Sequence, residues 1–144
     1  MNYRIRLAHV ADVAVMHRVR HRVRENRLAH PDRITEATYL PYIAAGSAWV
    51  AETDAGVVGF AAVDASARSG WALFIDPDAE GAGFGRAMHL RLLTWAQEQR
   101  LTQLTLSTEE GTRAARFYKR AGWVRAGTTP AGDALFAIDL REEA

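Results

Sequence analysis

Several kinds of residue and segment are scarce or missing in this sequence, and each absence excludes something. The 144 residues include no cysteine, which excludes disulfides, thiolate metal sites and cysteine nucleophiles. Its apolar runs fall well short of the roughly 20 residues that a membrane-spanning helix needs. The first residues lack the apolar core of a signal peptide. We therefore expect a cytoplasmic protein that does not associate with a membrane.

Positively and negatively charged residues are nearly balanced in this sequence. The net charge is +1, so the field of the whole molecule gives no reason to expect nucleic acid as a partner. The size and the 49% hydrophobic content suit one globular unit with its own core, and we expect residues 1–144 to form a single domain.

Histidine invites a metal hypothesis, which the neighbouring residues weaken. His17 and His21 stand four residues apart on a predicted helix, a spacing that can share a metal ion. No third ligand is evident, so we expect no metal site. The arginines nearby predict a solvated helix face, with Arg24 or Arg27 as the alternative contact for a substrate carboxylate.

Hydrophobic periodicity predicts an alternation of strands and helices. The predicted strands cover 3–7, 48–52, 57–63, 71–75, 104–107, 123–124 and 135–138. The predicted helices lie at 12–23 with Asp12 as the N-cap, at 35–46 with an interruption near Pro41, after the glycines of 81–85, and at 114–121. The polar segment 24–32 is predicted to be a loop, and the apolar strand 71–75 to be central and covered on both faces. This order predicts an α/β fold with a mixed sheet and helices on both faces.

One segment carries a specific signal. Phe74-Ile75-Asp76-Pro77 ends the apolar strand, and Gly81, Gly83 and Gly85 then alternate into a helix. Glycines permit positive φ and close approach of a ligand, and the start of a helix offers free N–H groups to phosphate. The pattern is neither a P-loop nor the dinucleotide-binding fingerprint. It predicts a site for a phosphorylated cofactor, with a tight turn that binds nothing as the alternative.

A second motif follows about thirty residues later. Residues 114–123 read Ala-x-x-Phe-Tyr-x-x-x-Gly-Trp, directly after the next predicted strand. The two motifs, in this order and at this separation, resemble those of the GNAT superfamily of N-acetyltransferases, and the order of elements is similar over essentially the whole chain. The resemblance implies a mostly antiparallel mixed sheet whose middle strands splay apart.

The resemblance also implies residue roles. The backbone of Phe74 and Ile75 would pair with the pantetheine arm of acetyl-CoA. Tyr118 would lie near the thioester sulfur and protonate the leaving thiolate, unless it is only a core aromatic. The pyrophosphate would meet the turn made of Gly81, Ala82, Gly83, Phe84, Gly85 and Arg86.

Two positions depart from the family pattern. Glu80 stands where Arg or Gln usually opens the turn, and Gly111 stands where Asn is common. A carboxylate beside a pyrophosphate repels it, so Arg86 or Arg113 would have to supply compensating charge.

The general base is the least determined residue. A carboxylate or a water chain must take the proton of the amine, and Glu109 is our candidate. Glu110 and Glu25 are alternatives for the same role, and Asp64 is a candidate for binding a cationic substrate. A solvated surface carboxylate is the competing interpretation for each of them.

The resemblance implies an enzyme that moves an acetyl group from acetyl-CoA directly to a primary amine of a small molecule or peptide. A covalent intermediate is disfavoured because cysteine is absent and Ser107 has no evident histidine partner. A non-catalytic sensor of acyl-CoA is one alternative, suggested by Glu80 and Gly111. A transferase acting on charged tRNA is another, disfavoured by the near-neutral charge. The apolar last strands would permit a homodimer.

Overall fold

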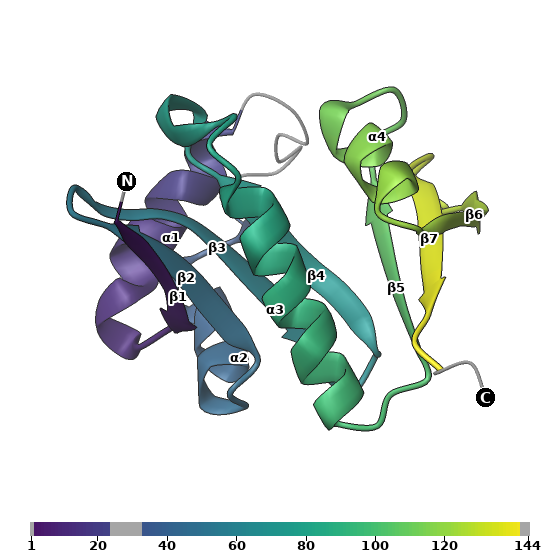
Figure 1. Cartoon of the computed structure of the whole chain (residues 1–144), viewed down its shortest axis with the longest axis horizontal. Helices are drawn as coiled ribbons and strands as arrows, with labels where there is room; N and C mark the ends of the chain where they lie inside the picture. The colour runs from purple at the N-terminus through teal and green to yellow at the C-terminus, as the bar shows by residue number, and fades with distance from the viewer. Residues whose placement is uncertain (1, 24–32, 142–144) are drawn as a thin grey trace.

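A seven-stranded sheet in the order β1-β2-β3-β4-β5-β7-β6 forms the centre of the molecule (Figure 1). The computed structural model describes residues 2–23 and 33–141. The strands are β1 (Tyr3–Leu7), β2 (Ala48–Thr53), β3 (Gly56–Asp64), β4 (Ser69–Ile75), β5 (Gln103–Thr108), β6 (Val124–Thr128) and β7 (Ala134–Asp139). Strands β4 and β5 are parallel, and the other described neighbours are antiparallel, so the predicted mixed sheet is confirmed.

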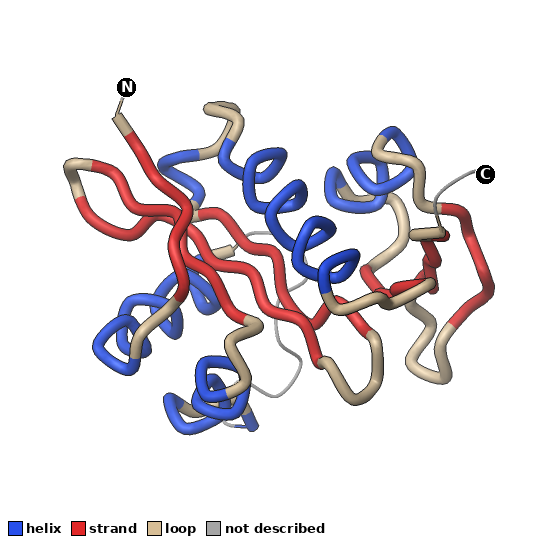
Figure 2. Tube along the Cα trace, turned by 60° about the horizontal axis from the view of Figure 1, so that its bottom comes forward, coloured by secondary structure: helices blue, strands red, loops and turns tan. Residues whose placement is uncertain are grey.

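Helices cover both faces of this sheet (Figure 2). One face carries η1 (Val10–Asp12), α1 (Val13–Arg22), η3 (Glu36–Tyr39) and α2 (Leu40–Ala44). The other face carries α3 (Phe84–Glu98) and α4 (Arg113–Arg120), with the short η4 (Pro77–Ala79) between β4 and α3. None of the described helices is long and apolar enough to cross a bilayer.

The predicted elements agree with the observed ones except in a few details. The predicted irregular helix at 35–46 consists of η3 followed by α2, with Pro41 in the first turn of α2. Asp12 precedes α1, but its side chain does not cap that helix. It accepts hydrogen bonds from the His9 N–H at 2.8 Å and from Arg6 at 2.8 and 2.9 Å, because the preceding 3-10 turn brings these donors closer. The predicted loop 24–32 lies outside the described residues.

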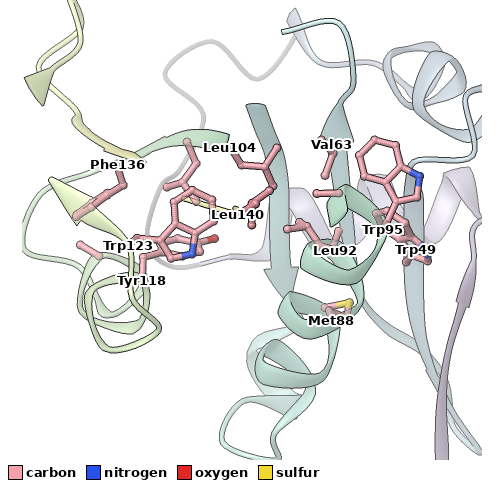
Figure 3. Packing of buried hydrophobic residues seen from close by; sticks show 14 of the residues in the cluster. Trp49, Val63, Met88, Leu92, Trp95, Leu104, Tyr118, Trp123, Phe136 and Leu140 are labelled. Atoms are coloured by element: carbon pink, nitrogen blue, oxygen red, sulfur yellow. The ribbon is translucent and has the colours of Figure 1, made fainter. Parts of the chain in front are cut away.

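The hydrophobic core lies on both faces of the sheet. Under α1 and α2 it contains Met16, Val19, Tyr39 and Phe60, all fully buried. Under α3 it contains Trp49, Met88, Leu92 and Trp95, which Figure 3 shows packed together. The apolar stripe of α3 thus packs on the sheet, and Trp49 of β2 is part of this packing.

The sheet is split between β4 and β5. Ser69 opposite Thr105 is the single register pair found between these strands, and the Thr105 N–H also donates to the Arg68 carbonyl at 3.1 Å. Beyond this point the strands diverge (Figure 1). As predicted, β4 is central and is covered on both faces: Leu73 and Ile75 pack with the core under α3, and Phe74 packs with the core under α1 and α2. Most of its side chains are only partly buried, because the neighbouring strand on one side moves away.

Aromatic side chains connect the two halves across the split. His89 of α3 and Trp123, which follows α4, are both buried, and the Trp123 Nε1–H donates to His89 Nε2 at 2.9 Å. The Tyr118 ring lies against Trp123, with centroids 5.6 Å apart, and Figure 3 shows the two side by side. Because His89 Nε2 accepts a hydrogen bond, its imidazole is neutral with the proton on Nδ1.

This contact predicts a pH dependence of stability. Burial lowers the pKa of His89, so the unfolded chain takes up a proton near pH 6.5 that the folded chain does not yet bind. The contribution of the neutral His89 to the free energy of unfolding is therefore present in full above about pH 6.5 and decreases as the pH is lowered from there. We expect His89→Gln, which keeps an acceptor but does not titrate, to lose less stability between pH 8 and pH 5 than the wild type, measured by thermal unfolding.

His89→Leu is the matched control, because it removes the titration and the acceptor together. It should be less stable than His89→Gln by about 1–3 kcal/mol at pH 8, since the buried indole N–H loses its partner. Equal loss of stability in the wild type and His89→Gln on acidification would contradict this account.

A glycine sets the distance between β3, β4 and α3. A Cβ on Gly59 would lie 2.7 Å from Ile75 Cδ1, 2.8 Å from the Phe74 carbonyl oxygen and 3.1 Å from Met88 Cε. The carbonyl is backbone and cannot turn aside. We expect Gly59→Ala to lower the free energy of unfolding by about 1–3 kcal/mol in denaturant titrations.

Gly70 of β4 provides the control for this prediction. A Cβ there would meet its nearest atoms at 3.6 Å, an ordinary contact. Gly70→Ala should stay within about 0.5 kcal/mol of the wild type. If the two variants are equally stable, Gly59 does not limit the packing.

Candidate active site

A cleft of about 400 Å³ occupies the split between the two halves of the sheet. Its walls come from β4, from the end of β5, and from helices on both faces of the sheet. Arg20 of α1 lines it from one face, and His89, Leu92 and Tyr118 line it from the other. The cleft therefore passes through the plane of the sheet where β4 and β5 separate.

The exposed edge of β4 offers backbone groups to this cleft. The Asp76 N–H donates to the Val58 carbonyl of β3, and residues along an antiparallel pair alternate in the direction of their backbone groups. Phe74 is thus paired with β3, whereas Leu73 and Ile75 direct N–H and C=O toward the split. Phe74 and Ile75 were the two strand residues expected to pair with a ligand. The register leaves the backbone groups of Ile75 available on the open edge, together with those of Leu73, whereas those of Phe74 pair with β3.

The glycine turn leads directly into α3. Gly81 and Gly83 have φ of 81° and 89°, in the left-handed region, and Gly83 is the N-cap. Gly85 lies within the helix and does not need positive φ. The first hydrogen bond of the helix runs from the Ala87 N–H to the Gly83 carbonyl.

The start of α3 therefore suits an anion. The N–H groups of Phe84, Gly85 and Arg86 precede the first helical hydrogen bond and have no partner within the helix. The Phe84 side chain is buried and anchors the turn, while Gly81, Ala82, Gly83 and Arg86 are exposed. Such N–H groups, with the positive end of the helix dipole, fit a diphosphate.

The structure accounts for both departures from the family pattern. Glu80 Oε2 accepts a hydrogen bond from Arg113 Nη1 at 2.8 Å, so the carboxylate beside the turn is neutralised by the first residue of α4. Gly111 has φ of 74°, a conformation that Asn and Gly both adopt readily.

Tyr118 is buried and lines the cleft. Burial raises the pKa of its hydroxyl well above the usual value of a phenol. The hydroxyl is therefore protonated at neutral pH and can give up a proton, but it cannot act as a resting base.

The carboxylates predicted as bases have different surroundings. Glu109 follows β5 directly and lines the cleft. Glu110 instead forms an ion pair with Arg125. Asp64 accepts a hydrogen bond from the Ala67 N–H at 3.1 Å in the turn between β3 and β4. Glu25 lies outside the described residues, so Glu109 is the predicted carboxylate that the structure brings to the cleft.

Sequence reasoning missed four polar residues of the cleft: Arg20, His89, Thr108 and Asp133. A signal existed for two of them. Arg20 follows Met16 by one helical turn, on the buried side of α1, and His89 precedes Leu92 by three residues, on the apolar side of α3. Asp133 lies in the connection before β7 and had no local signal.

The prediction of a solvated arginine face is wrong for Arg20, whereas Arg22 is exposed as predicted and also forms ion pairs. Arg20 is half-buried in the cleft. Arg22 forms ion pairs with Asp76 at 3.0 Å and with Asp78 at 2.9 Å. Tertiary contacts with the β4–α3 connection thus engage side chains that helical spacing alone turns toward water. Arg24 and Arg27 lie outside the described residues.

The two histidines of α1 take part in local contacts. His17 Nδ1 lies 3.0 Å from the Tyr39 hydroxyl, and His21 Nδ1 lies 2.9 Å from the His17 carbonyl. In residues 2–23 and 33–141, no group of three His, Cys, Asp or Glu side chains has the arrangement of a metal site.

Comparison with solved structures finds the same fold in several acetyltransferases. PaiA N-acetyltransferase of Thermoplasma acidophilum, in complex with coenzyme A, is 14% identical, with a TM-score of 0.85 over 96% of this chain and 99% of that one. The ribosomal-protein-S18-alanine N-acetyltransferase of Escherichia coli is 17% identical, with a TM-score of 0.80 over 99% and 97%. YncA of Salmonella typhimurium, with acetyl-CoA, is 19% identical, with a TM-score of 0.81 over 100% and 97%.

Comparison of the sequence gives a family match. A search of curated proteins finds no match for this chain. The family model of the acetyltransferase (GNAT) domain matches residues 44–125, more than half of the chain and the part that contains β4, the glycine turn and Tyr118. The chain belongs to the GNAT acetyltransferase family.

Proposed function

We propose that this acetyltransferase moves an acetyl group from acetyl-CoA directly to a primary amine of a small molecule or peptide, with Tyr118 as the general acid. The observation that carries the proposal is one arrangement. A buried, protonated Tyr118 lines the same cleft as the open edge of β4, and the anion-binding start of α3 follows that strand.

The residues of the cleft fit acetyl-CoA, the cosubstrate. The N–H groups of Phe84, Gly85 and Arg86 suit its pyrophosphate, and the edge of β4 at Leu73 and Ile75 suits its amide-containing pantetheine arm, as an added strand would. When bound, acetyl-CoA supplies an activated thioester. Backbone N–H groups of β4 can then stabilise the negative charge that gathers on its carbonyl oxygen.

Tyr118 suits the end of the reaction. A thiolate leaves when the thioester is cleaved, and a phenol hydroxyl held in an apolar setting can donate a proton to it. A phenol is already protonated at neutral pH, and burial raises the pKa of Tyr118 further, so the hydroxyl enters the reaction with its proton. To act as the general acid, Tyr118 does not have to change its protonation state before the substrates bind.

Glu109 suits the beginning of the reaction. A protonated amine must lose a proton before it can attack, and Glu109 is an exposed carboxylate of the cleft lining that can accept it. Water can carry the proton from there to solvent. We therefore assign Glu109 the role of base or of the group that attracts the ammonium.

The alternative of a non-catalytic sensor was based on Glu80 and Gly111, and the structure explains both residues without a loss of activity. Arg113 neutralises Glu80, and the backbone conformation at Gly111 is one that glycine adopts as readily as the usual asparagine. Neither departure disables the cleft, and membership of an acetyltransferase family supports catalysis.

Replacement of Tyr118 by phenylalanine tests the proposal. Tyr118→Phe should lower kcat by at least about 100-fold, because the leaving thiolate loses its proton donor, while the Kd for acetyl-CoA stays within about twofold. Release of the CoA thiol can be followed with a thiol reagent, since the chain has no cysteine to react with it. The acceptor panel would include amino acids, amino acid amides, polyamines and short peptides.

Tyr42→Phe is the control, because Tyr42 stacks on Trp71 through its ring, which the substitution keeps. If Tyr118→Phe transfers acetyl groups at the wild-type rate, Tyr118 is not the general acid. Binding of acetyl-CoA by the wild type without transfer to any amine would favour the sensor.

The charge of Glu80 gives a second prediction. If the pyrophosphate lies at the start of α3, Glu80→Gln removes a nearby negative charge and the ion pair with Arg113. We expect the Kd for acetyl-CoA, measured by calorimetry, to fall by up to about tenfold at low ionic strength and by less at high salt.

Glu98→Gln serves as the control for this measurement. It removes the same charge at the far end of α3, where it should leave the affinity unchanged. Equal affinity of Glu80→Gln and the wild type at low salt would mean that the diphosphate does not lie beside Glu80.

A further inference from the structure

The wall of the cleft beneath α1 has its own chemistry. Phe74 and Trp71 of β4 pack with the core under α1 and α2, away from α3 and Tyr118. Arg20, Glu109 and Asp133 also line the cleft. These three residues are the charged part of the lining, whereas the residues contributed by α3 and α4 are neutral or apolar.

Arg20 is the permanent cation of the cleft lining within the described residues. Its Cζ lies 4.3 Å from the centroid of the Phe74 ring, so the flat guanidinium stacks on the aromatic face. Stacking uses the face of the guanidinium and leaves the in-plane N–H donors directed to its edges. The side chain is half-buried and burial lowers the pKa of Arg20, which shows that its charge is partly removed from water.

An opposite charge faces this cation. Glu109 is close enough to Arg20 for electrostatic attraction, and it comes from β5, on the other side of the split. The cleft therefore presents a positive group on the β4 side and a negative group on the β5 side. A ligand that carries both charges on neighbouring atoms complements both walls.

We infer that the acceptor is a small amino acid, whose carboxylate Arg20 binds while its amine lies toward Glu109. The inference rests on the proposed function, which it narrows. Arg20 is then a specificity-determining residue, and its fork of N–H donors matches a carboxylate in a bidentate manner. Transfer forms the C–N bond and breaks the C–S bond. The ammonium gives up two protons, of which one neutralises the thiolate and the other leaves through Glu109 to solvent.

Pairs of acceptors that differ in the carboxylate alone test this inference. Each α-amino acid is compared with its own amide at equal concentrations of unprotonated amine. The wild type should prefer the acid, and Arg20→Gln should lower kcat/KM for the acid by about 10 to 100-fold, chiefly through KM. The amide should be little affected, as should the Kd for acetyl-CoA, and Arg20→Lys should recover part of the loss.

Arg18→Gln is the matched control, since Arg18 is exposed on the same helix and does not line the cleft. A binding measurement gives a readout besides activity. In the presence of CoA, N-acetyl amino acids should bind the wild type more tightly than Arg20→Gln, and their amides should bind both equally.

The possible failures are distinguishable. Transfer to amides, polyamines or peptides in preference to amino acids overturns the assignment of the acceptor and leaves the proposed function intact. Equal losses for acid and amide in Arg20→Gln would mean that Arg20 only supports Phe74. Absence of transfer to every acceptor, with acetyl-CoA bound, overturns both.

Discussion

Strand β4 separates from its parallel neighbour β5 beyond the pair formed by Ser69 and Thr105, and the cleft exists because of this divergence. A central strand normally has both edges hydrogen-bonded, so its unpaired edge must be satisfied by water or by a ligand. Here the edge is placed beside the start of α3 and opposite α4. One interruption of the sheet thus creates a backbone-binding groove without any loop insertion.

The turn between β4 and α3 is fixed mainly by its backbone. Arg22 contacts it from α1 and Arg113 from α4, but these ion pairs are largely exposed, and exposed pairs contribute about 1 kcal/mol or less. The left-handed conformations of Gly81 and Gly83 and the buried ring of Phe84 impose its shape more firmly. The two arginines instead determine the charge that an approaching anion meets.

Burial divides the cleft into a neutral side and a charged side. On the neutral side, Tyr118 and His89 both remain uncharged, the first because burial raises its pKa and the second because it lowers it. Elsewhere in the lining, the half-buried Arg20 and the exposed Glu109 carry side chains of opposite charge. The lining therefore offers a neutral, buried environment and a charged environment within a single cleft.

Local periodicity and motif spacing were enough to predict the order of the elements, the glycine turn into α3 and the position of Tyr118 on the following helix. Three features became visible in the folded chain: Arg20 lines the cleft, Arg125 forms an ion pair with Glu110, and Asp133 reaches the cleft from a distant connection. These outcomes depend on which segments, far apart in the chain, pack side by side. Burial and ion pairing depend on contacts between distant segments, whereas the hydrophobic pattern can be read from neighbouring residues in the chain.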